Sequence, residues 1–184
     1  MRRIVAVAVV LAAIVAGLLV YLVVRGGGDD PAVAHVGREP IRKSQLETVI
    51  RHFRLEAEAE GRQFPSESSP AGRHTRDRLL ALLVYRTELR QAARRLGVRV
   101  TRVQVLRRIR SASGGEEANP DAFAYGSAEA QLLFEALYRK VTRDVKAPTQ
   151  AELSARKNAA MKRFVDRLQR ETKVRYEPGY APGS

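Results

Sequence analysis

The stretch "VAHVGREPIRKSQLE", residues 33–47, combines three local signals. Its first four residues form a short apolar run that is typical of a β-strand, and the turn residues Gly37 and Glu39–Pro40 follow. Ser44 and Glu47 then have the spacing of a capping box, in which each side chain satisfies a free backbone N–H at a helix start. The stretch therefore predicts a strand, a turn and a helix beginning at Ser44.

The helix predicted after this turn needs a partner for its apolar face. That face consists of Leu46, Val49, Ile50, Phe53 and Ala57 at helical spacing. Near the other end of the chain, residues 173–176, "KVRY", alternate as a strand does. Because a lone strand is unstable in water, we expect residues 33–36 to pair with 173–176. This predicts a mainly α domain over 33–176, closed by a small two-stranded sheet that joins its N- and C-terminal ends, with an extended tail at 177–184.

Helical patterns fill the region between the two strands. They predict helices over residues 75–97, from Thr101, from Ser127 to Pro148 and from Thr149, with capping boxes at the second and the last of these starts. The expected buried positions include Leu79, Leu82, Leu83, Leu89, Ala93, Leu96, Val103, Leu106, Ile109 and Phe134. The Pro-, Ser- and Gly-rich residues 61–73 and 111–123 are expected to be loops.

The N-terminus carries the strongest membrane signal. Residues 4–24 form an uncharged run of 21 residues after Arg2 and Arg3, long enough to cross the ~30 Å hydrocarbon core of a bilayer. The basic flank predicts that residues 1–3 are cytoplasmic and that the rest of the chain is extracytoplasmic, so that the protein is a single-pass protein of the cell membrane. Residues 25–32 then form a linker. A cleaved signal peptide and a buried core helix are the alternatives for this run.

Positive charge is concentrated in one part of the sequence. Of the formal net charge of +13, residues 61–115 contribute +10, from 13 Arg against Glu67, Asp77 and Glu88. This pattern is typical either of solvated helix faces or of a surface for an acidic lipid, polymer or polypeptide. Nucleic acid is not an expected partner for a domain outside the cytoplasm.

Several segments resemble one family. Val33, Ala34, Val36 and Ile41 match the opening Val-Ala-x-Val-Asn-Gly-x-x-Ile of the SurA- and PrsA-like extracytoplasmic chaperones and peptidyl-prolyl isomerases, with Gly37-Arg38 in place of Asn-Gly. "LLALLVYRTELRQAARRLGVRVTRVQVLRRI", "LLFEALYRKVTRDVKAPTQAEL" and "FVDRLQRETKVRYEPGYAP" resemble the helices and final strand that follow in that family, in the same order. The resemblance covers residues 33–180 and implies a SurA N-terminal-like helical chaperone domain.

The chain departs from this family at the catalytic domain. In the family a parvulin domain lies between the fourth helix and the last one, whereas here only 18 residues separate Val145 from Phe164. The His-Ile opening and the Gly-Gly pair before a second His are also missing. We therefore expect no isomerase activity and no catalytic residues. His35, His52 and His74 lack the spacing of a metal pair, Cys is absent, and no nucleotide-binding motif occurs, so we expect no metal and no cofactor.

These observations favour a membrane-anchored, extracytoplasmic chaperone-like protein that binds unfolded or exported polypeptides. Exposed aromatic side chains are the expected contacts with such clients, and the candidates are Phe53, Phe64, Phe123, Tyr125 and Tyr138. We expect Phe64, Phe123 and Tyr125 in loops. Two alternatives stay open: a structural single-pass envelope adaptor that binds one partner through its basic helices, and an isomerase-related protein with residual activity.

Overall fold

A computed structural model describes residues 30–114 and 120–183 of the chain. The chain divides into two units, Met1–Pro31 and Ala32–Ser184. The predicted membrane segment 4–24, the cytoplasmic residues 1–3 and most of the linker 25–32 lie outside the described residues. Within the described ranges, none of the helices has the length and apolar character needed to cross a membrane.

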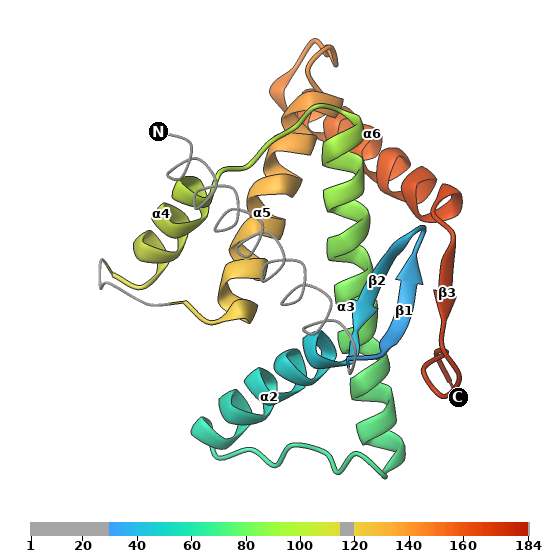
Figure 1. Cartoon of the computed structure of the whole chain (residues 1–184). Coiled ribbons are helices and arrows are strands. Elements are labelled where there is room, and N and C mark those ends of the chain that lie inside the picture. The colour runs from blue at the N-terminus through green and yellow to red at the C-terminus, as the bar shows by residue number, and fades with distance from the viewer. Residues whose placement is uncertain (1–29, 115–119, 184) are drawn as a thin grey trace, which may run out of the picture. The chain divides into compact units, whose positions relative to one another are not determined.

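The second unit is mainly helical, as the sequence predicts (Figure 1). Its elements, in order, are β1 (Ala32–Val36), β2 (Glu39–Arg42), α2 (Lys43–Ala59), α3 (Pro70–Arg95), α4 (Arg102–Ala112), α5 (Ala122–Val141), α6 (Gln150–Glu171) and β3 (Val174–Tyr176). Helix α3 contacts α2, α5, α6, β1 and β2. It therefore forms the spine of this unit.

The sheet joins the two ends of the domain, and it has three strands rather than the predicted two. Its strand order is β2-β1-β3, and both pairings are antiparallel. The predicted pairing of the first strand with the last is confirmed: His35 faces Arg175, and two flanking backbone bonds, Gly37 N to Lys173 O (2.8 Å) and Glu177 N to Val33 O (3.0 Å), close the ladder. The two-stranded prediction was wrong because β2 was taken for a turn.

The turn between β1 and β2 explains why a strand fits there. Gly37 has a φ of +60°, and none of the described non-glycine residues, Arg38 included, has a positive φ. This is the pattern of a two-residue type II′ hairpin, which needs glycine only at the first central position. Pro40 faces His35 across the ladder. Because the backbone groups of His35 are directed at β3, the missing N–H of Pro40 removes no ladder bond, as an edge strand allows.

The first two helices begin earlier than the sequence suggested. Helix α2 is capped at Arg42, whose backbone N–H donates to Gln45 Oε1 at 2.7 Å, so the capping box expected at Ser44 was wrong. Helix α3 begins at Pro70, inside the expected loop, because Ser69 Oγ accepts a hydrogen bond from Gly72 N at 3.0 Å and proline suits the first helical position.

The later helix starts are mixed. At the start of α4 the Thr101–Gln104 capping box is confirmed, and at the start of α6 Thr149 Oγ1 accepts from Glu152 N at 3.2 Å. Helix α5 begins after Asp121, whose carboxylate accepts from Ala124 N at 2.6 Å, and not at Ser127 as expected. Phe123 and Tyr125 therefore lie on a helix and not in a loop.

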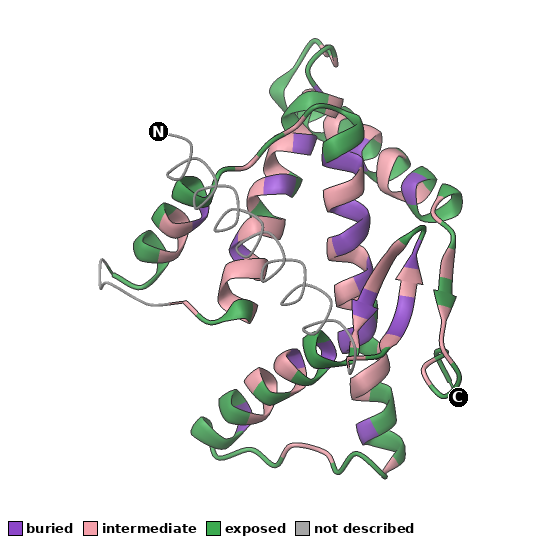
Figure 2. Ribbon diagram, viewed as in Figure 1, coloured by how far each residue is buried: buried purple, intermediate pink, exposed green. Residues whose placement is uncertain are grey.

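Two hydrophobic clusters lie along α3 (Figure 2). The first joins the sheet, α2 and the N-terminal half of α3, and the second joins the C-terminal half of α3 with α5 and α6. With 26 residues, α3 is about 39 Å long, enough to serve both clusters.

Three expected core positions are exposed instead. The side chain of Val103 is 64% exposed, since the buried residue of α4 is Val105. Leu96 and Phe134 are each 37% exposed. Phe134 thus belongs to the surface of α5, although its spacing suggested the core.

Candidate functional site

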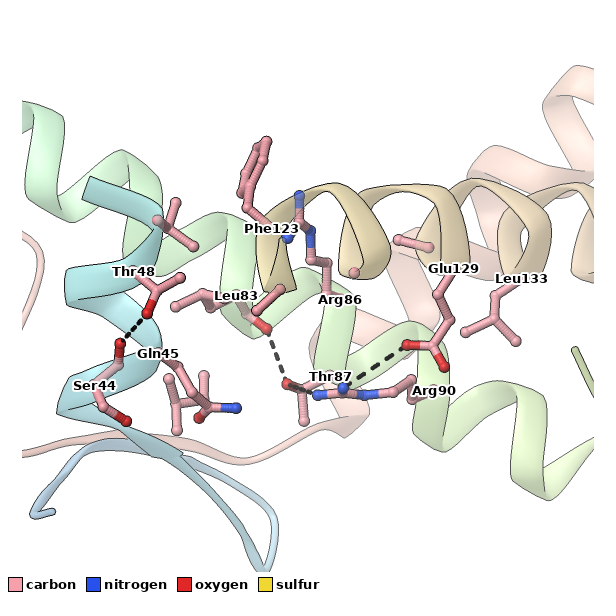
Figure 3. Close-up of a pocket in the computed structure, with 15 residues that line it drawn as sticks. Ser44, Gln45, Thr48, Leu83, Arg86, Thr87, Arg90, Phe123, Glu129 and Leu133 are labelled. Atoms are coloured by element: carbon pink, nitrogen blue, oxygen red, sulfur yellow. Dashed lines mark hydrogen bonds and ion pairs between the residues drawn. The ribbon is translucent and has the colours of Figure 1, made fainter. Parts of the chain in front are cut away.

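Two neighbouring cavities open along the first half of α5. The first cavity has a volume of about 320 Å³ and lies between α2, α3 and α5 (Figure 3). The second cavity, of about 820 Å³, is lined from α4 by Arg102, Leu106 and Arg110, and from α5 by Tyr125. Both cavities are lined by Arg90, Ala122, Gly126 and Glu129. Together they form one continuous groove, which we call the α5 groove.

Small side chains on α5 create the space for the first cavity. Ala122, Gly126 and Ala130 recur every four residues and therefore share one helix face. A Cβ at residue 126 would lie 3.4 Å from Arg86 Nη1, at the near limit of ordinary van der Waals contact. The opposite wall is apolar where Leu83 and Val49 line it.

Polar groups in the first cavity are held in place by hydrogen bonds. Thr48 Oγ1 donates to Ser44 O at 2.8 Å, and Thr87 Oγ1 donates to Leu83 O at 2.9 Å (Figure 3). Arg90 Nη2 donates to Thr87 Oγ1 at 3.1 Å. These contacts fix Arg90 against the wall formed by its own helix.

A stack of rings and one guanidinium forms the end of the first cavity. The Phe123 ring stacks on His52 with their centroids 4.0 Å apart, and the Arg86 guanidinium lies 4.8 Å from the Phe123 centroid. His52 Nδ1 lies 3.2 Å from Asp121 Oδ2, which ties α2 to the start of α5. The bond from the Ala124 N–H, with a smaller contribution from His52, lowers the pKa of the Asp121 carboxyl.

The structure places the five predicted contact residues in different surroundings. Phe123 lines the first cavity and Tyr125 the second. Phe64 lines a separate cavity of about 470 Å³ beside α2, with the Arg54 guanidinium 5.5 Å from its ring. Phe53 packs against the first hydrophobic cluster, and Tyr138 packs against the second, with its hydroxyl donating to Asn158 Oδ1 at 3.0 Å. The structure therefore brings Phe53 and Phe123 into edge contact, with their ring centroids 5.2 Å apart, and places Phe123 and Tyr125 in neighbouring cavities.

Sequence reasoning missed the two arginines of the first cavity. Arg86 and Arg90 are four residues apart on α3, so both side chains lie on one helix face. The spacing of four residues is present in the sequence, but this segment contains many other arginines, so the pair did not stand out. The cavity also depends on residues of α5, which lie far away along the chain.

Metal chemistry has no visible ligand set in the described part of the chain. Three or more potential His, Asp or Glu ligands do not come together there. His35 Nε2 lies 3.3 Å from Glu177 Oε1, an interaction that links β1 to the C-terminal tail. The α5 groove is lined by apolar side chains, aromatic rings and guanidinium groups.

The structure is thus a helical domain that is closed by pairing of its ends and carries a groove with an apolar and cationic lining. A comparison with known families assigns the chain to one of them. The chain belongs to the SurA-like N-terminal domain family, whose match covers residues 1–123. This family is chaperone-like, and no parvulin domain is detected in the 184-residue chain. The comparison with curated proteins gave no match.

Proposed function

We propose that this protein is a membrane-anchored, extracytoplasmic chaperone-like protein that binds unfolded or exported polypeptides and has no isomerase activity. In this proposal residues 4–24 are the membrane anchor, with residues 1–3 in the cytoplasm. The domain over Ala32–Ser184 performs the binding. Membership of a chaperone-like family supports this proposal.

The α5 groove is the observation that carries the proposal. An unfolded chain exposes apolar side chains and unpaired backbone groups, and a receptor for many such chains needs an open channel with both apolar and polar walls. The groove provides apolar contacts at Leu83, Phe123 and Tyr125. Because it runs over two adjacent cavities that share four lining residues, it fits an extended segment better than a compact ligand.

Anchoring to the membrane would allow a groove with low affinity to capture clients. A domain tethered near the site of export meets emerging chains at a high effective concentration, so each individual contact can be weak and brief. Weak contacts also allow the client to dissociate. This matters because the sequence carries no nucleotide-binding motif that could supply energy for release.

Suppression of aggregation tests this function. The full chain, held in nanodiscs of zwitterionic lipid, is mixed with several unrelated unfolded clients while light scattering is followed. We expect slower scattering for each client, compared with empty nanodiscs. No effect on any client would contradict the proposal.

The basic segment 61–115 favours a second candidate, an envelope adaptor with one partner. Among the described residues of this segment, Arg102, Arg107 and Arg110 have no ion-pair partner. Saturable capture of one envelope component, with no effect on client aggregation, would favour the adaptor over the chaperone.

The position of the chain across the membrane needs its own experiment. Protease added to intact spheroplasts should remove the bulk of residues 25–184 if they are extracytoplasmic. Full protection of the chain in intact spheroplasts, with digestion after lysis, would contradict the proposed topology.

A further inference from the structure

The first cavity is lined by two guanidinium groups, those of Arg86 and Arg90, and by one carboxylate, that of Glu129. Arg86 Nη2 donates to Ser127 Oγ at 2.6 Å and its guanidinium lies against the Phe123 ring, but no described carboxylate lies within ion-pair distance of it. Arg90 Nη1 lies 4.0 Å from Glu129 Oε2, and Arg90 Nη2 lies 3.4 Å from Glu39 Oε1. The partners of Arg86 are thus neutral, whereas Arg90 lies within ion-pair range of both Glu39 and Glu129.

Two other acidic groups near the groove, Glu39 and Asp121, also have partners outside the first cavity. Glu39 makes its shorter contact, 2.5 Å, with Arg94, outside the cavity. Asp121, which lines the second cavity, caps α5 and faces His52. Over the whole groove, Arg86, Arg90, Arg102 and Arg110 stand against Asp121 and Glu129. Positive charge is therefore in excess along the groove.

Burial makes this excess costly. Arg86 is half-buried, and its burial together with the charge of Arg90 lowers the pKa of its guanidinium. Arg90 Nε is buried and has no hydrogen-bond partner among the described residues. A half-buried cation without a counter-charge gains more from an incoming anion than an exposed one does, because less water competes for it.

The shape of the cavity selects the kind of anion. Its volume of about 320 Å³ suits one or two side chains rather than a folded surface. Leu83, Val49 and Leu133 provide apolar walls next to the guanidinium groups. A carboxylate on a short aliphatic stem, in a chain that continues along the α5 groove, matches both features.

We propose that the first cavity binds a Glu or Asp side chain of an extended client segment between Arg86 and Arg90, so that acidic segments of unfolded polypeptides are preferred. This inference rests on the proposed chaperone function. It adds a specificity that the family membership does not contain.

Paired peptides test the preference. Two fluorescent, unfolded, C-terminally amidated peptides differ only in having Glu or Gln at the same two positions, and their binding to the full chain in zwitterionic nanodiscs is measured by anisotropy. Amidation removes the terminal carboxylate, so that only side chains can supply the anion. We expect about tenfold tighter binding of the Glu peptide, as charge-assisted hydrogen bonds to one carboxylate allow.

Variants locate the preference. Arg86→Gln should reduce it to below about twofold, and Arg86→Lys should retain part of it, because lysine keeps the charge but not the planar fork. Arg95→Gln is the matched control: it removes the same charge from an exposed position on α3 and should leave the preference intact. Ala122→Leu, at the exposed mouth shared by both cavities, should weaken the binding of both peptides. Each variant is used only if its helical circular dichroism is unchanged.

The outcomes distinguish failure of the carboxylate site from failure of the proposed chaperone function. Equal binding of both peptides by the unmodified chain overturns the carboxylate site and leaves the chaperone proposal standing. An equal loss of preference in Arg86→Gln and Arg95→Gln also overturns the site, since it shows long-range attraction alone. If Ala122→Leu binds the Glu peptide unchanged, the site lies elsewhere. If neither peptide binds to the unmodified chain, both the site and the proposed function fail.

Discussion

Strand β3 offers a direct measure of how the domain closes, because its neighbouring side chains face opposite ways. Tyr176 is half-buried and packs against the first hydrophobic cluster, whereas Arg175 between it and Val174 is exposed. Tyr176→Ala and Arg175→Ala both leave the backbone bonds of Lys173 and Glu177 to β1 in place. The difference between the two variants therefore isolates the packing of one ring.

The expected magnitude follows from the burial of that ring. Replacing a fully buried large aromatic residue by alanine costs about 3–5 kcal/mol, so a half-buried ring should cost about 2 kcal/mol. For a domain of this size, 1 kcal/mol shifts the thermal midpoint by about 2–4 °C, which gives a loss of about 4–8 °C for Tyr176→Ala. Arg175→Ala should stay within about 0.5 kcal/mol, as exposed substitutions do.

Thermal and urea unfolding of the full chain in detergent, followed by circular dichroism at 222 nm for the helices, measure both variants. A shift of the same size in Tyr176→Ala and Arg175→Ala would refute the reasoning that β3 packs one face against the core. Removing residues 173–184 should cost more than Tyr176→Ala, because the truncation also deletes the two backbone bonds to β1.

Three further predictions concern other parts of the chain. A Cβ at residue 72 would lie 1.9 Å from the backbone oxygen of Ser66, so Gly72→Ala must displace the loop and should cost at least about 1–3 kcal/mol; an unchanged urea midpoint would contradict this. Burial raises the pKa of the Glu88 carboxyl, so the folded state binds its proton more tightly than the unfolded state, and the contribution of Glu88 to stability falls as pH rises above about 4.3, the ordinary value. The Glu88→Gln variant should therefore be as stable as the unmodified chain in acid and more stable at neutral pH. A stability difference between the two chains that does not vary with pH would contradict this prediction. Proline cis–trans exchange in a test peptide should keep its uncatalysed time of tens to hundreds of seconds, and a rate that rises with protein concentration would show isomerase activity.

The closure of the fold was predictable from sequence because its signals are local. The apolar run at 33–36 and the alternation at 173–176 each indicate a strand, and a lone strand has nowhere to pair in a helical domain except with the other. The missed strand β2 shows the limit of such signals. Pro40 reads as a turn residue in the sequence, and only the hairpin register shows that its missing N–H faces away from β1.

The starts of the long helices were mispredicted for a similar reason. Ser69-Pro70 is a capping signal, but its Ser-, Pro- and Gly-rich surroundings favour a loop. Gly126 likewise reads as a break in the sequence, whereas in the structure it lies within α5. In both places the residue types favour a break where the structure has a helix.

The groove itself could be predicted only in part. Phe123 and Tyr125 were identified as candidate contacts from their residue type, and the structure brings both to the α5 groove. Arg86 joins Phe123 from a different helix. A contact between two helices this far apart along the chain depends on how they pack, which the periodicity of either one does not contain.

Photo-crosslinking from the α5 groove tests the central claim most directly. A benzophenone amino acid replaces Tyr125 in the full chain, and a matched variant carries it at Lys162, an exposed position on α6. With an unfolded client present, we expect a crosslink yield at position 125 several-fold above that at position 162, and a decrease at 125 when unlabelled client competes. Equal yields at the two positions, or a yield at position 125 that competitor does not lower, would contradict the claim that the groove binds unfolded polypeptides.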